Sequence, residues 1–66
     1  PLVLAGNDTA ARCNAIISEA HVAYELKAEA ERIVTGGAAL PCKLSSLMAL
    51  DAPQALVQAL MEVLLA

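Results

Sequence analysis

The last quarter of the chain combines a high apolar content with a helical period. Eleven of the fifteen residues after Asp51 are Ala, Val, Leu or Met. The larger of these side chains recur at spacings of three and four residues, which places them on one face of an α-helix. That stripe consists of Leu56, Val57, Leu60, Met61 and Leu64. We therefore expect a helix over residues 52–65, in which Asp51 is the N-cap and Gln54 completes a capping box.

The first half of the chain predicts a much longer helix. Residues 10–34 contain neither Gly nor Pro and are rich in Ala, Glu, Leu, Lys and Arg, which are strong helix formers. Asp8, or alternatively Thr9, can cap the start. Thr35, Gly36 and Gly37 can end the helix, because a glycine can adopt the left-handed C-cap conformation. The expected helix covers residues 9–35, and its length is roughly 38 Å at 1.5 Å per residue.

A short helix is expected between these two. Leu40, Leu44, Leu47 and Met48 fall at helical spacing, and Pro41 suits a first turn. The expected bounds are residues 41–50. Residues 1–7, ahead of the long helix, are expected to form an extended arm. The predicted fold is thus all-α: one small domain over residues 1–66, in which the arm, the long helix and the two shorter helices form an incomplete bundle.

The size and composition of the chain suggest that this bundle needs a partner. The chain has 66 residues, 59% of them hydrophobic, and Tyr24 is its only aromatic residue. So short a chain buries a small fraction of its surface when it folds alone. We expect its apolar faces to be covered by a protein partner or by self-association. The predicted interface consists of Ile16, Ala20, Ala23, Leu56, Val57, Leu60, Met61 and Leu64.

The charged residues argue against two other kinds of partner. The net charge is −3, with only four Lys and Arg residues, whereas nucleic-acid binding selects clusters of basic side chains. The one long apolar run is interrupted by Gln54, Gln58 and Glu62, so no transmembrane span is expected. No cofactor is expected either.

Cys13 and Cys42 raise the question of a disulfide. If residues 13–35 form an unbroken helix, they span about 33 Å. The seven residues that follow reach back at most about 24 Å, while bonded cysteines lie within about 7 Å. An intrachain bond is therefore disfavoured unless the long helix breaks. Buried free thiols and a disulfide to another chain remain open.

Two clusters of polar residues could carry chemistry. His21 and Glu25 lie four residues apart and could offer two metal ligands, but the chain has no second His, and zinc sites use three or four protein ligands. Glu25, Glu29 and Glu31 could form an acidic site. On a helix rich in charge, both groups are expected to be solvated surface.

The sequence thus favours a non-enzymatic helical interaction or assembly module, completed by homo- or hetero-oligomerisation. The alternative is one chain of a processed secreted protein, such as a toxin or enzyme subunit, held to a sister chain and possibly disulfide-linked through Cys13 or Cys42. It is motivated by the start at Pro1 and the end at Ala66. A third possibility is binding of a lipid or another apolar ligand within a loosely filled bundle.

Overall fold

The described part of the chain forms a bundle of four helices. The computed structural model describes the backbone of residues 3–66 and the side chains of residues 8–66, and within these ranges it contains helices and no strand. The helices are α1 (Val3–Glu19), α2 (Tyr24–Thr35), α3 (Leu40–Ala49) and α4 (Gln54–Leu65). The prediction of an all-α chain is therefore confirmed. None of the described helices is both long and apolar enough to cross a membrane.

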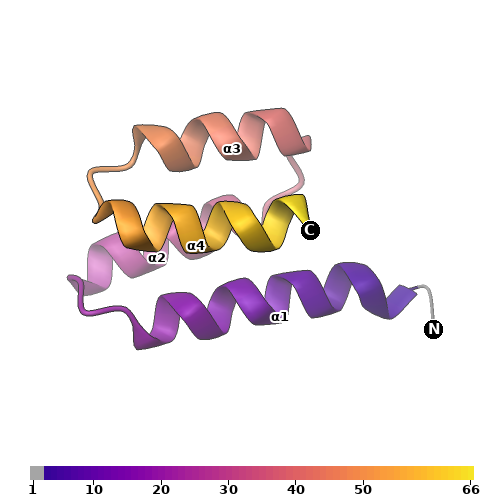
Figure 1. The fold of residues 1–66 in the computed structure, drawn as a ribbon, viewed down its shortest axis with the longest axis horizontal. Coiled ribbons are helices and arrows are strands. Elements are labelled where there is room, and N and C mark those ends of the chain that lie inside the picture. The colour runs from indigo at the N-terminus through magenta and orange to yellow at the C-terminus, as the bar shows by residue number, and fades with distance from the viewer. Residues whose placement is uncertain (1–2) are drawn as a thin grey trace.

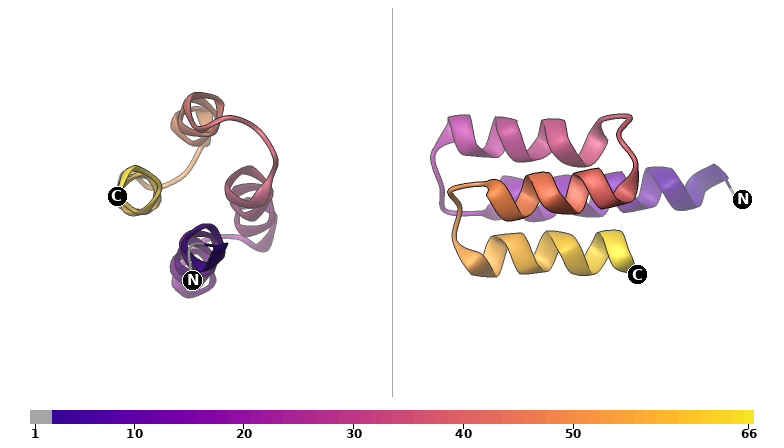
Figure 2. Two further views of the ribbon diagram at one scale, coloured as in Figure 1. Left: turned by 90° about the vertical axis from the view of Figure 1, so that its right-hand side faces the viewer. Right: turned by 90° about the horizontal axis from the view of Figure 1, so that it is seen from above.

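The four helices run alternately in opposite directions (Figure 1). Seen along the bundle axis, they stand at the corners of a four-sided ring in chain order (Figure 2). Consecutive helices pack against each other, and α4 closes the ring by packing against α1. Each helix thus has two neighbours, so the predicted incomplete bundle is corrected to a closed one.

The long helix predicted over residues 9–35 is wrong, because the chain turns back between α1 and α2. Ala23 adopts an extended conformation (φ −63°, ψ 151°) as the N-cap of α2, without a side-chain capping bond. The turn brings Ala30 and Val34 into the same buried cluster as Ile17 of α1. Intrinsic helix propensity differs by only tenths of a kcal/mol among most residues, and tertiary packing routinely overrides it.

Lys27 and Lys43 help to stabilise two of the turns. Each is the fourth residue of its helix, and its Nζ donates to a backbone oxygen near the end of the preceding helix. Lys27 bonds to Ser18 O at 3.0 Å, and Lys43 bonds to Val34 O at 3.0 Å. A cation at a helix C-terminus interacts favourably with the partial negative charge of the last carbonyls. This role of the two lysines was not predicted from the sequence.

The extended arm predicted over residues 1–7 is also wrong where the structure describes it. The backbone of residues 3–7 belongs to α1, and Pro1 and Leu2 lie outside the described residues. Asp8 is therefore inside a helix and not at its cap. A helix can continue through Gly6 because a single interior glycine costs only about 1 kcal/mol relative to alanine.

The two helices of the second half lie close to their predicted positions, but their ends are formed differently. The N-cap of α4 is Pro53 and not Asp51. The amides of Leu56 and Val57 both donate to Pro53 O. At the end of α2, Gly36 is extended (φ −69°) and not left-handed. A Cβ there would lie 2.9 Å from Arg32 O, so close approach of the backbone favours glycine.

The core lies on the axis of the bundle and receives side chains from all four helices. Its buried members are Cys13 and Ile17 of α1, Ala30 and Val34 of α2, Leu47 of α3, and Leu56 and Leu60 of α4. They are small or branched aliphatic side chains, which fits the near absence of aromatic residues. A single chain therefore supplies a complete, if small, apolar interior.

Candidate functional site

The two flanks of α4 form the most apolar hollows described on the molecule. One groove lies between α1 and α4 and has a volume of about 420 Å³. The other lies between α3 and α4 and has a volume of about 410 Å³. The hollows at α1–α2 and α2–α3 are smaller, and charged side chains such as Lys27 and Arg32 line them. We therefore take the two grooves beside α4 as the candidate sites.

None of the described residues that line the groove between α3 and α4, called the α3–α4 groove below, is charged. Its lining residues are Met48, Leu50, Ala52, Gln54, Val57, Gln58 and Met61. Met48 is 68% exposed, so its thioether side chain stands at the edge of the groove and not within the core. Leu50, Val57 and Met61 are partly buried and pack against the core. Methionine side chains are flexible and adapt to the shape of a partner surface.

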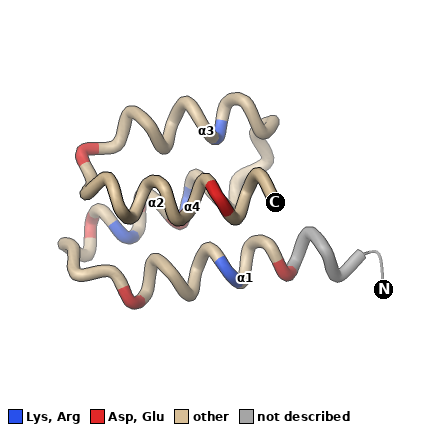
Figure 3. The backbone as a smooth tube through the Cα atoms, in the orientation of Figure 1, with Lys and Arg blue, Asp and Glu red and all other residues tan. Residues whose placement is uncertain are grey.

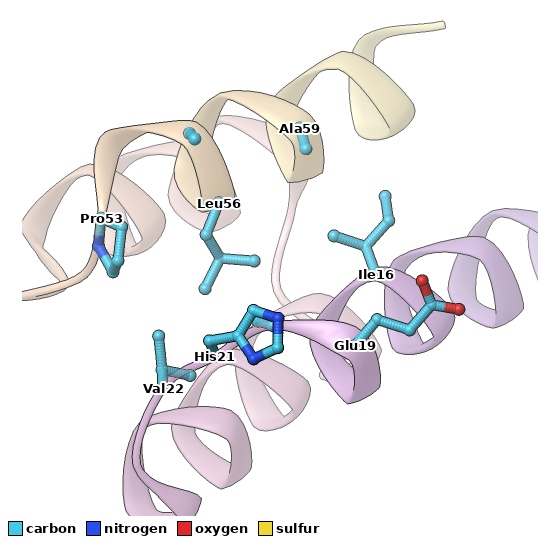
Figure 4. A pocket seen from close by; sticks show the side chains of 9 residues that line it. Ile16, Glu19, His21, Val22, Pro53, Leu56 and Ala59 are labelled. Atoms are coloured by element: carbon cyan, nitrogen blue, oxygen red, sulfur yellow. The ribbon is translucent and has the colours of Figure 1, made fainter.

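The groove between α1 and α4, called the α1–α4 groove below, combines apolar walls with two polar groups. Its lining residues are Ile16, Glu19, Ala20, His21, Val22, Pro53, Ala55, Leu56 and Ala59. Figure 4 shows Glu19 and His21 together on the α1 side, while Pro53 and Ala59 stand on the α4 side. Both polar residues are exposed. This groove exists only because the chain turns after Glu19.

The structure divides the predicted interface residues into three groups. Leu56 and Leu60 are 7% and 0% exposed, and they belong to the core of this chain. Ala23 is exposed in the turn between α1 and α2. The others are partly buried and pack against the core: Ile16, Ala20, Val57, Met61 and Leu64. Of these, Val57 and Met61 meet in the α3–α4 groove, and Ile16 and Ala20 meet in the α1–α4 groove.

The two cysteines lie in different environments, and both thiols are free. Cys13 is completely buried, whereas Cys42 is exposed on α3. Burial raises the pKa of the Cys13 thiol, although the positive charges of Lys43 and Arg12 act in the opposite direction. The chain does not form the unbroken helix that would have kept Cys13 and Cys42 apart. A disulfide to another chain remains a prediction, and Cys42 is the thiol that is accessible for it.

The polar clusters considered from the sequence do not form a metal site in the described part of the chain. His21 lies in the turn and Glu25 in the first turn of α2, so they are not ligands one turn apart on a single helix. Among the described residues there is no group of three or more His, Cys, Asp or Glu that could hold a metal ion.

The buried Oδ1 of Asn14 has no hydrogen-bond partner within the described part of the chain.

The chain was compared with protein-family models, with curated proteins and with solved structures, and none of the three gave a match.

Proposed function

We propose that the protein is a non-enzymatic assembly module that binds a second copy of itself through the α3–α4 groove. The observation that carries this proposal is the side chain of Met48, which is 68% exposed at the edge of a groove with uncharged walls. Of the four large apolar side chains found exposed among the described residues, three belong to α3 and α4: Leu40, Met48 and Leu65. Contiguous exposed apolar surface marks interaction sites, and Met48 is the member of this set that lines the α3–α4 groove.

The shape of this surface suits association with an identical copy. In a twofold dimer the same patch serves both subunits, so each protrusion must find a matching hollow on the same face. The α3–α4 groove supplies both, because Met48 forms its edge while Val57 and Met61 line its interior. Rotation about a twofold axis would place Met48 of each copy in the groove of the other.

The distribution of charge also favours this face. Residues 8–35 hold eight of the eleven charged residues, and only Lys43, Asp51 and Glu62 follow. Figure 3 shows this concentration on α1 and α2. Because each chain has a net charge of −3, two copies repel least where the facing surfaces are neutral. A charged partner, by contrast, would find little to pair with in this groove.

The proposed interface differs from the one predicted from the sequence. The apolar stripe of α4 was expected to need a partner, but Leu56 and Leu60 are already covered by the other three helices. Association would therefore use the flank of α4 and the exposed face of α3. A standard interface takes roughly 800 Å² from each partner, a modest share of the 4417 Å² surface of the chain.

The test is the solution mass of the wild type and of two charge variants, measured by sedimentation equilibrium. Met48→Lys places a charge at the edge of the groove. Tyr24→Lys places the same charge on α2 at an apolar side chain that is 80% exposed, which makes it the matched control. We expect dimers for the wild type and for Tyr24→Lys, and a monomer for Met48→Lys, with equal helical circular dichroism in all three. A monomeric wild type, or a Met48→Lys variant that remains dimeric, would show that the proposal is wrong.

A further inference from the structure

We propose that the α1–α4 groove is a binding site for small organic cations. The hydrocarbon body of such a ligand lies in the groove, and its protonated amine lies at the α1 edge of the groove. This site is independent of self-association, because the two grooves beside α4 share no lining residue.

The hollow follows from the sizes of the side chains around it. Ile16, Val22 and Leu56 supply branched aliphatic surface, and each packs within or against the core. Alanines line the space where longer side chains would have filled it: Ala20, Ala55 and Ala59. The resulting volume of about 420 Å³ lies within the range of roughly 300–1,000 Å³ that is typical of small-molecule sites. The walls therefore favour a hydrocarbon body.

The polar groups of the groove select the charge of the ligand. Glu19 is the last residue of α1, so its carboxylate adds to the partial negative charge of the helix C-terminus. Its neighbour His21 can accept a hydrogen bond when its imidazole is neutral. Of the described residues that line the groove, none is Lys or Arg. A primary ammonium group at this edge can donate to the Glu19 carboxylate, and His21 lies on the same side of the groove (Figure 4).

An anionic ligand is the competing possibility, because the other side of the groove includes the start of α4. Pro53 is the N-cap there and makes no side-chain capping bond, so the amides of Gln54 and Ala55, which precede the first bonded amide of α4, are available to an acceptor. Partial charges at a helix terminus are weaker than the full charge of Glu19. The order of affinity for matched cationic, neutral and anionic probes separates the two possibilities.

The experiment is an NMR titration of the ¹⁵N-labelled protein with phenethylammonium, 2-phenylethanol and 3-phenylpropionate, which share a phenyl ring and a short alkyl chain. We expect saturable shifts at the amides of Ala20, Ala55 and Ala59, with dissociation constants in the millimolar range. The cation should bind roughly twofold to fivefold more tightly than the alcohol, as expected for one exposed ion pair. Equal or tighter binding of 3-phenylpropionate, or no saturable shift at these amides with phenethylammonium, would overturn the proposal.

Two variants test the assignment to these residues. Ala59→Leu fills the groove and should weaken the binding of every probe that binds there. Glu19→Gln keeps the shape of the groove and should remove only the preference for the cation. Glu29→Gln is the matched control, because it removes an exposed carboxylate from the hollow between α2 and α3. Loss of the preference in Glu29→Gln but not in Glu19→Gln would place the cation elsewhere and refute the assignment. Circular dichroism verifies that each variant is folded.

Discussion

Replacement of Leu60 by alanine tests whether the apolar stripe of α4 belongs to the core of this chain or to an interface between chains. Leu60 is 0% exposed within a single chain. If the closed bundle is correct, Leu60→Ala must lower the free energy of unfolding of the monomer. If the stripe instead faces a partner, the substitution must mainly weaken association.

The magnitude follows from the burial of this side chain. Leucine to alanine removes three carbon atoms, which contribute about 2.4 kcal/mol at roughly 0.8 kcal/mol each. The cavity left behind adds to this loss, so we expect about 3–4 kcal/mol in total. A chain of 66 residues has a total stability of about 3–10 kcal/mol. The substitution therefore removes a large part of it.

Leu65→Ala is the matched control on the same helix. Leu65 is 61% exposed, so the same chemical change should cost less than about 1 kcal/mol. Both substitutions are made in Met48→Lys, where self-association does not contribute to stability. If Leu60→Ala leaves the chain unfolded without denaturant, the milder Leu60→Val supplies the comparison.

The assay is urea unfolding followed by helical circular dichroism at two protein concentrations that differ tenfold. We expect midpoints that do not depend on concentration and a much larger loss for Leu60→Ala than for Leu65→Ala. Equal losses for the two variants would refute the placement of Leu60 in the core.

Two further predictions concern the turns and the buried thiol. Ala23→Ser should stabilise the protein by about 1 kcal/mol, because Ala23 already has the extended backbone of an N-cap and serine can accept a hydrogen bond from an amide of the first turn. Ala38→Ser is the control, and a Tm of Ala23→Ser no higher than that of Ala38→Ser would contradict the prediction. Burial raises the pKa of the Cys13 thiol in the folded state above its ordinary value of 9.0, so the unfolded chain loses this proton at a lower pH than the folded chain. The free energy of unfolding should therefore fall as the pH rises from 9.0 through the folded pKa. The urea midpoint of the wild type should fall across this pH range, and that of Cys13→Ala should fall less. If the two midpoints fell equally with pH, the contribution of Cys13 would be refuted.

The candidate sites could be predicted only in part from the sequence. Val57 and Met61 were expected at an interface because of their helical spacing, and both line the α3–α4 groove. The neighbouring Met48 was assigned only to a helix, since spacing along one helix does not show which neighbour lies beside it. The α1–α4 groove could not be predicted, because it joins residues more than thirty positions apart across a turn that the sequence analysis missed.

The sequence by itself determined that the chain is helical. The period of its apolar residues and its Gly and Pro positions located α3 and α4 within a few residues, because these signals act over one or two turns. Only the tertiary structure decided the break between α1 and α2. No Gly or Pro marks that break, and residues 20–23 are compatible with either a helix or a turn.

The physical reason is the energy of packing between helices. A continuous helix keeps a few more backbone hydrogen bonds, whereas a turn at Ala20–Ala23 lets α2 bury Ala30 and Val34 against α1. That gain depends on surfaces supplied by α3 and α4, so it cannot be read from the local sequence. The turn also closes the ring, covers Leu60 and leaves a groove along each of the two flanks of α4.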